Sequence, residues 1–375
     1  MSDDFRLPIR ADLEGVASYG APQLDVPARL NVNENPFPIP DDLARAMGDA
    51  VARVAVGLNR YPERDAVELR SALAQYLCRE SGADVDWRQV WAANGSNEVM
   101  HHVFLAFGGP GRLAITFDPT YSMYPEYARD TFTQFQAFPR RADFGIDIAG
   151  AVAEIERLRP SLVLVTSPNN PTGTALALDD TTVILDSARA AGAMVVVDEA
   201  YAEFRRAGVA SACTLLDEYP NLIVSRTMSK AFAMAGARLG YLAAADPRVI
   251  DALQVVRLPY HLSAVTQAVA ITALEHAEVL QAQVDLLRSE RDALAAWLVA
   301  AGFTVAPSDA NFVLFGMFDD RDAVWRGLLE HGVLIRQTGP AGWLRASIGT
   351  PEENAMLKSA LTDVTGRAPS LEAAG

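Results

Sequence analysis

The sequence predicts an α/β protein with a mainly parallel sheet in a large lobe and a smaller α+β lobe. Apolar runs typical of strands alternate with stretches typical of helices between residues 112 and 225, the order in which crossover helices join parallel strands. The chain has 375 residues, more than one hydrophobic core usually supports. Past Pro259 long helical stretches replace this alternation, which indicates a change of lobe.

The elements of the large lobe are expected in a regular order. Each expected strand is a short run rich in apolar and β-branched residues. Strands are expected at 112–117, 131–138, 162–166, 193–197 and 221–225, and helices at 99–107, 149–159 and 179–191. Two further helices are expected at 266–276 and 278–301, before the shorter elements of the small lobe.

Five segments follow from this pattern. They are an N-terminal arm (1–18), a first part of the small lobe (19–55), the large lobe (56–260), the rest of the small lobe (261–365) and a disordered tail (366–375). The tail is short of the apolar residues that a packed core requires. The sequence contains no internal repeat.

Composition and charge narrow the class of protein. Hydrophobic residues make up 50% and charged residues 21%, as in soluble globular proteins. The net charge is −15 without a basic cluster, which argues against nucleic-acid binding. Cys78 and Cys213 form neither a disulfide framework nor a metal-ligand spacing. Without a secretory signal or a membrane-spanning run, the expected location is the cytoplasm, away from membranes.

The run Ser225 to Arg238 carries the most informative lysine of the chain, Lys230. An amine attacks a carbonyl only when unprotonated, and burial beside another cation lowers a lysine pKa enough for this near neutral pH. The hydroxyls of Thr227 and Ser229 and the guanidinium of Arg238 are donors suited to a phosphate. The run fits an imine-forming lysine beside an anion site, and taken alone it fits a solvated surface lysine equally well.

A carboxylate and a phenol follow the apolar run 195–197. A pyridoxal ring needs an anion at its nitrogen, because the protonated ring is the electron sink for a carbanion. Asp198 suits that role, and Tyr201 is placed to reach the ring hydroxyl. Taken alone, Asp198 is better explained as an acidic residue that caps a following helix.

A third polar cluster closes the apolar run 162–165. Pro168, Pro171 and Gly173 prevent a helix from starting at once, so that Asn170 is presented at the carboxyl end of the strand. Ligands of open α/β sheets bind at that edge. The three clusters, in this order along the chain, point together to a pyridoxal phosphate site.

With these clusters the chain resembles the fold-type I pyridoxal-phosphate aminotransferases, and among them the histidinol-phosphate aminotransferases, from about residue 19 to about residue 354. The resemblance implies a mainly parallel, seven-stranded large-lobe sheet and pyridoxal 5'-phosphate as cofactor. It implies that Lys230 forms the imine and that Asp198 pairs with the pyridine nitrogen. Asn170 and Tyr201 would bond the ring hydroxyl, and the hydroxyls and arginine around the lysine would hold the cofactor phosphate.

Three further segments match the family in the same order. Gly95, Ser96 and Asn97 open an expected helix, where backbone N–H groups and the helix dipole favour a phosphate. Tyr121 matches an aromatic residue that stacks on the cofactor ring. Tyr61 matches a tyrosine that reaches the cofactor phosphate of the other subunit, which implies a homodimer with shared active sites.

The substrate side also follows from the resemblance. Arg345 matches the arginine that grips the substrate carboxylate or phosphate, and Arg336 assists it. Tyr19 and Tyr260 match further contacts to the substrate phosphate. Loop positions of this kind set specificity.

The segment 33–40 matches an amino-terminal signature that lines the site and contributes Asn35 to the substrate. It departs from the commoner pattern at Pro38, where glycine is more usual. Proline fixes φ and stiffens this lip of the site. The departure concerns the pose of the substrate and leaves the cofactor chemistry untouched.

The resemblance implies transfer of an amino group between L-histidinol phosphate with its oxo partner and glutamate with 2-oxoglutarate, in histidine biosynthesis. Lys230 would hold the cofactor and then act as the base that moves the proton. An aromatic amino-acid aminotransferase is an alternative with a very similar sequence. A non-catalytic regulator that keeps the cofactor has no chemical need for the intact set Lys230, Asp198, Asn170, Tyr201 and Arg238.

Overall fold

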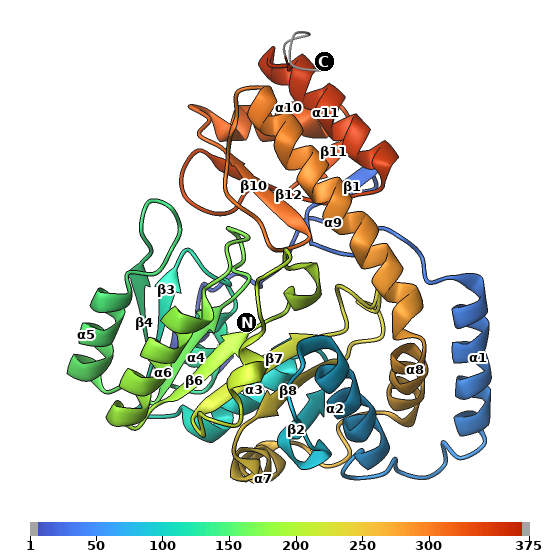
Figure 1. Ribbon diagram of the computed structural model, residues 1–375, viewed down its shortest axis with the longest axis vertical. Helices are drawn as coiled ribbons and strands as arrows, with labels where there is room; N and C mark the ends of the chain where they lie inside the picture. The colour runs from blue at the N-terminus through green and yellow to red at the C-terminus, as the bar shows by residue number, and fades with distance from the viewer. Residues whose placement is uncertain (1–6, 370–375) are drawn as a thin grey trace, which may run out of the picture.

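The computed structural model describes residues 7–369, which form a large and a small lobe (Figure 1). The large lobe is built on a seven-stranded sheet in which β8 is antiparallel to both its neighbours and every other pair is parallel. Its strands, in sheet order, are β2 (Val90–Ala93), β8 (Gly240–Ala244), β7 (Leu222–Thr227), β6 (Met194–Asp198), β5 (Leu162–Thr166), β3 (Leu113–Asp118) and β4 (Gln134–Pro139). The mainly parallel sheet expected from the sequence is confirmed.

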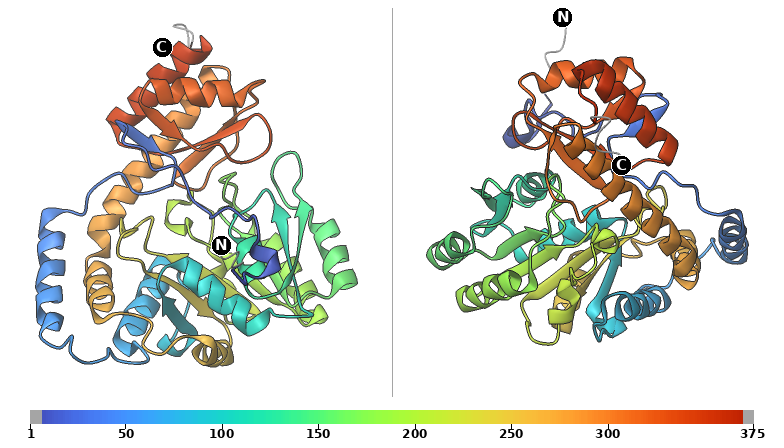
Figure 2. Two further views of the ribbon diagram at one scale, coloured as in Figure 1. Left: turned by 180° about the vertical axis from the view of Figure 1, so that it is seen from behind. Right: turned by 45° about the horizontal axis from the view of Figure 1, so that its top comes forward.

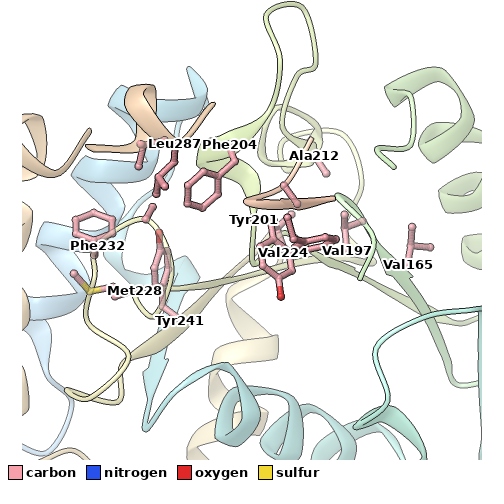
Figure 3. Packing of buried hydrophobic residues seen from close by; sticks show 14 of the residues in the cluster. Val165, Val197, Tyr201, Phe204, Ala212, Val224, Met228, Phe232, Tyr241 and Leu287 are labelled. Carbon is pink, nitrogen blue, oxygen red and sulfur yellow. The ribbon is translucent and has the colours of Figure 1, made fainter. Parts of the chain in front are cut away.

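Helices cover both faces of this sheet. Successive side chains of a strand point to opposite faces, so Val195 and Val197 of β6 join one core while Val196 between them joins another. Figure 3 shows Val165, Val197 and Val224 of three neighbouring strands in a row within the first core. The first core includes α2 (Val67–Ser81), α5 (Ile148–Leu158) and α6 (Leu178–Ala191), and the second includes α3 (Ser96–Phe107), α4 (Tyr124–Asp130) and α7 (Pro247–Val256).

The small lobe joins the two ends of the described chain. Near its start, β1 (Ala28–Leu30) pairs in parallel with β11 (Val333–Ile335). A second sheet has the order β12 (Trp343–Ser347), β10 (Phe312–Gly316) and β9 (Thr304–Val305). The helices of this lobe are α9 (Ala277–Ala300), α10 (Arg321–Glu330) and α11 (Pro351–Thr365). Thr350 caps α11 reciprocally with Glu353, which fixes where this helix starts.

The helices α1 (Asp41–Ala55) and α8 (Ala264–Glu275) do not follow the boundary that we expected between the two lobes. We expected the small lobe to include residues up to 55 and to resume at 261, but α8 packs against α1 and against α2 of the large lobe. Figure 1 shows α1 and α8 side by side below the small lobe, with α9 rising from them. The apolar faces of α1 and α8 pack against each other. Neither segment, taken alone, predicts this contact.

Several element ends differ from the expectation. The helix expected at 99–107 begins at Ser96. The strand expected from residue 131 begins at Gln134, because Thr131 and Phe132 complete the turn after α4, with Phe132 at a φ of 56°. Helices α1 and α2 were not among the expected elements.

The N-terminal arm lies against the large lobe (Figure 2). The guanidinium of Arg10 sits 4.4 Å from the ring centre of Phe132 and donates to the carbonyl of Arg129 at 3.4 Å. Arm residues 1–6 and tail residues 370–375 lie outside the described residues, so the disorder expected for the tail stays a prediction there. Among residues 7–369 no helix is long and apolar enough to cross a membrane.

Candidate active site

The carboxyl ends of β5, β6 and β7 bring the three sequence clusters to one edge of the large sheet. The strand register places Thr166 beside Asp198, and Asp198 beside Ser225. A cavity of about 410 Å³ opens at this edge and is lined by residues of both lobes. The expected site residues that line it are Tyr19, Ser96, Asn97, Tyr121, Asn170, Asp198, Tyr201, Thr227, Ser229, Lys230, Arg238, Arg336 and Arg345.

Lys230 presents its amine to the cavity just beyond the end of β7. The Nζ atom donates to the carbonyl oxygen of Val32 at 2.9 Å. Burial, helped by the charges of Arg345 and Arg238 and opposed by that of Glu34, lowers the pKa of Lys230 to about 8. About a tenth of this amine is therefore unprotonated at pH 7, far more than for an ordinary lysine, and the unprotonated form is the one that a nucleophile or a general base requires.

Asp198 ends β6 with a carboxylate that is 5% exposed. Its Oδ2 accepts from the Tyr124 hydroxyl at 2.9 Å and its Oδ1 accepts from the Ser225 hydroxyl at 3.0 Å. Burial raises the pKa of Asp198, while these two hydrogen bonds act in the opposite direction. The carboxylate lines the cavity without a cation bonded to it among the described residues, so a protonated ring nitrogen is a matching partner.

Two amides surround the hydroxyl of Tyr201. Asn33 donates to it at 3.0 Å and Asn170 at 3.4 Å. Burial raises the pKa of Tyr201, against the effect of the Arg345 charge. The phenol therefore keeps its proton at neutral pH and remains a donor for an oxygen atom placed in the cavity.

Hydroxyls and backbone N–H groups line a concave surface at the start of α3, which we call the cup; it is formed by Gly95, Ser96, Thr227 and Arg238. Gly95 precedes the helix at a φ of 85°, with no side chain bonded to the helix start. A Cβ at Gly95 would lie 2.6 Å from Nη2 of Arg238, so glycine allows the guanidinium to approach. Ser96 and Thr227 complete the cavity wall here. Free N–H groups at a helix start, hydroxyls and an arginine together suit a phosphate.

Tyr121 stands over the cavity wall and is fixed at its hydroxyl. It donates to Oδ1 of Asn97 at 3.1 Å, and the Tyr127 hydroxyl donates to the same oxygen at 2.9 Å. Its ring meets that of Tyr124 edge-on, with the ring centres 5.6 Å apart. A ring held in this way provides a flat wall for another ring.

Arg345 forms an anion site on the small-lobe side of the cavity. It is only 6% exposed, donates to Oδ1 of Asn170, and donates to the carbonyl of Asn31 at 2.9 Å. Its Nε is buried without a hydrogen-bond partner in the described part of the chain. Arg336 is joined to Arg345 by two backbone hydrogen bonds of 2.9 and 3.0 Å. Two cations thus converge, and a buried donor is available for an anion.

Three expected substrate or cofactor residues lie away from this cavity. Asn35 donates from Nδ2 to Gln283 on α9 at 3.2 Å. Tyr61 and Tyr260 stack on each other with ring centres 4.5 Å apart. Tyr61 is 80% exposed. Within one chain these residues therefore do not reach the site.

Sequence reasoning missed two residues that the structure brings to the site. Asn33, rather than Asn35, bonds Tyr201, and its φ of 56° turns the backbone at this point. Tyr124 bonds Asp198 from α4. The resemblance to the family indicated a lining role for segment 33–40 and for Tyr121, but it singled out Asn35 and Tyr121 rather than Asn33 and Tyr124.

The cavity therefore holds an amine of lowered pKa, a buried carboxylate, a fixed phenol and two separate anion sites. This set can hold a ring carrying a phosphate and can move a proton at a bound amine. In residues 7–369 no group of three or more His, Cys, Asp or Glu side chains is arranged to hold a metal ion.

Comparisons with known proteins agree with this geometry. The family model described as aminotransferase class I and II matches residues 27–361. A histidinol-phosphate aminotransferase of Thermobifida fusca is 61% identical over 362 residues, which cover 96% of each chain. A histidinol-phosphate aminotransferase 3 of Burkholderia lata is 56% identical over 358 residues, again 96% of each chain.

Solved structures share the fold. A histidinol-phosphate aminotransferase of Sinorhizobium meliloti, crystallised with pyridoxal 5'-phosphate, aligns with a TM-score of 0.84 at 23% identity and covers 96% of this chain and 98% of its own. An aspartate aminotransferase variant of Thermus thermophilus aligns with a TM-score of 0.78 at 26% identity and covers 94% and 97%. The likeness at 23% identity supports the fold alone.

Proposed function

The chain belongs to the class I and II aminotransferases, and from this premise we propose that it transfers an amino group between L-histidinol phosphate and 2-oxoglutarate. The observation that carries the proposal is the buried Arg345, whose Nε has no hydrogen-bond partner among residues 7–369, in the same cavity as Lys230. Relatives more than 50% identical over nearly the whole chain act on histidinol phosphate by name. The reaction belongs to histidine biosynthesis.

The residues at the sheet edge fit pyridoxal 5'-phosphate. Bound there, the cofactor supplies an electron sink for the carbanion formed when a proton leaves the substrate carbon. Lys230 would hold it covalently, and Asp198 would keep its ring nitrogen protonated. Tyr201 and Asn170 would bond the ring hydroxyl.

The phosphate of the cofactor fits the cup at the start of α3. The approach of Arg238 over Gly95, which a Cβ would block, is the feature that supports this placement. Ser96, Thr227 and Ser229 would add hydroxyl donors, and Tyr121 would provide the flat wall against the ring. Each group adds a neutral or charge-assisted hydrogen bond, or a ring contact.

One anion pocket would serve both substrates. Histidinol phosphate has no carboxylate, so its phosphate would occupy the place that the glutamate carboxylate takes in the other half-reaction. Arg345 and Arg336 would bind either anion, and Tyr19 would add a neutral hydrogen bond from the cavity wall. Lys230 would move the proton at the substrate carbon once its amine is free and unprotonated.

We further propose a homodimer in which Tyr61 of one subunit reaches the cofactor phosphate of the other. The exposed position of Tyr61 and its stacking on Tyr260 outside the cavity support this. The same arrangement would bring Tyr260 to the substrate phosphate of the partner's site. A cytoplasmic location stays a prediction from the sequence.

A comparison of amino donors tests the function against the aromatic alternative. The loaded enzyme is mixed in single turnovers with histidinol phosphate, unphosphorylated histidinol, phenylalanine and glutamate, and cofactor absorbance is followed. Histidinol phosphate should give the highest kcat/KM and histidinol a low one, because histidinol lacks the anion that Arg345 binds. A higher kcat/KM for phenylalanine than for histidinol phosphate would replace the proposal by the aromatic activity.

A further inference from the structure

One carboxylate of the cavity, that of Glu34, has no role in the chemistry described above. Glu34 lies on the exposed lip of the cavity between two fixed neighbours. On one side Asn33 bonds Tyr201, and on the other Asn35 bonds Gln283 of α9. The carbonyl of Pro38 also accepts from Gln283, at 2.9 Å. The backbone is therefore held at both ends, and the Glu34 side chain is presented at the mouth from a rigid segment.

Glu34 carries a negative charge in a cavity whose charged side chains are mostly cations. The cations that line the cavity are Lys230, Arg238, Arg336 and Arg345. Its carboxylates are those of Asp198 and Glu34, and Asp198 is already bonded to Tyr124 and Ser225. The Glu34 carboxylate has no hydrogen bond or ion pair with any other described residue.

The carboxylate of Glu34 and the amine of Lys230 line the same cavity. Among the groups that act on Lys230, Glu34 is the one that raises its pKa, against Arg345 and Arg238. Glu34 therefore lies near enough to the amine for its charge to act there, from the lip rather than from the sheet. A substrate bound between Lys230 and Arg345 would have its remaining substituent near this lip.

Under the proposed function that substituent is an imidazole ring. The phosphate is taken by Arg345 and the amine is taken at Lys230, which leaves the ring as the third group to be recognised. A neutral imidazole always carries one N–H donor, and its cation carries two. An unpaired carboxylate is the acceptor that forms the strongest hydrogen bond with such a donor.

We propose that the Glu34 carboxylate accepts a hydrogen bond from the imidazole ring of histidinol phosphate and selects imidazole over phenyl at this site. The inference rests on the proposed function. The Glu34 charge should also affect the two amino donors in opposite ways. It attracts the imidazole N–H of histidinol phosphate, whereas it repels the side-chain carboxylate of glutamate, which would occupy the same side of the cavity.

The test is Glu34→Gln, assayed in single turnovers with three amino donors. They are histidinol phosphate, its analogue with phenyl in place of imidazole, and glutamate. The kcat/KM for histidinol phosphate should fall about tenfold, the size of one charge-assisted hydrogen bond at a partly exposed position. The phenyl analogue should be unaffected, and glutamate should react at the same rate or faster. Glu34→Asp should retain part of the preference for imidazole.

A matched control removes a nearby charge outside the cavity. Asp25 is exposed and lies on the same side of the small lobe without lining the cavity, so Asp25→Asn should leave all three rates unchanged. An equal change on all three donors, or no change with histidinol phosphate, in an enzyme that prefers histidinol phosphate would overturn the role of Glu34 alone. A wild-type enzyme without activity on histidinol phosphate would overturn the proposed function as well.

Discussion

The floor of the cavity and the outer edge of the large lobe differ in how completely one chain builds them. The floor, defined here as Asn170, Asp198, Tyr201 and Lys230, consists of buried or half-buried side chains bonded to partners in the same chain. The outer edge, residues 56–61 and 255–260, exposes apolar side chains. These are Val56, Leu58, Tyr61, Val255, Leu258 and Tyr260.

The difference indicates where the proposed second subunit would contribute. Floor residues sit at the ends of parallel strands, so the sheet itself brings them together. The outer edge has no such frame, and an exposed apolar surface of this kind is typical of an interaction site. Catalysis at the amine should therefore depend on one chain, whereas completion of the phosphate site should depend on two.

The largest effect is expected on the floor, from Lys230→Ala. Loss of the covalent attachment and of the base should lower turnover by roughly 10⁴-fold or more, since general base catalysis alone is commonly worth 10²–10⁴. Stopped-flow half-reactions measure the loss. Borohydride reduction of the wild-type enzyme should fix the cofactor to the peptide that contains Lys230. Transamination by the variant at the normal rate would remove Lys230 from the mechanism.

The next largest effect is expected from Arg345→Ala. The loss of a charge-assisted hydrogen bond costs about 1.5–3 kcal/mol, or roughly 10- to 150-fold in kcat/KM. Both half-reactions should suffer, because under the proposed function one pocket serves both anions. Arg326→Ala, which removes an exposed cation on α10 of the same lobe, is the control and should react normally. A defect confined to glutamate would show that the phosphate binds elsewhere.

The pKa of Lys230 predicts a pH dependence of cofactor capture by the cofactor-free protein. The unprotonated amine attacks the aldehyde, and the pKa of this amine is lowered to about 8. The capture rate should therefore fall about tenfold per pH unit below pH 8 and level off above it. Arg345→Ala should move this midpoint upward, because the Arg345 charge lowers the pKa. A midpoint near the ordinary lysine value of 10.5 in the wild type would mean that the amine is not buried as described.

The smallest effect is expected from Tyr124→Phe, which removes one hydrogen bond to Asp198. A hydrogen bond to a carboxylate is worth about 1.5–3 kcal/mol. Only part of this should reach the reaction, because Ser225 keeps its bond to Asp198, so kcat/KM should drop about two- to tenfold. Tyr241→Phe is a matched control, because the buried Tyr241 hydroxyl has no hydrogen-bond partner within the described chain. Equal losses in both variants would show that the effect comes from packing and not from Asp198.

The same contrast explains what the sequence could predict. Lys230, Asp198 and Asn170 follow recognisable strands, and parallel strands end at one edge, so their convergence follows from the pattern. Asn33 was missed in favour of Asn35 because a backbone turn with positive φ decides which asparagine points inward. No hydrophobic pattern records such a turn.

The packing of α1 on α8 was missed for a related reason. Both helices are far apart in sequence, and only the folded chain pairs them. The roles proposed for Tyr61 and Tyr260 require a second chain, and within one chain their exposure and stacking outside the cavity are what supports them. They stay predictions.

The central claim, a floor complete in one chain and an edge shared between two, is tested most directly by mixing subunits. Lys230→Ala subunits and Tyr61→Phe subunits, carrying different tags, are co-expressed and the heterodimers are isolated by both tags. One site of each heterodimer then combines Lys230 of one chain with Tyr61 of the other. With a shared site we expect about half of the wild-type activity, carried by this one intact site. Purified heterodimers with about half the activity of the Tyr61→Phe parent, as expected if each chain completes its own site, would contradict a shared site.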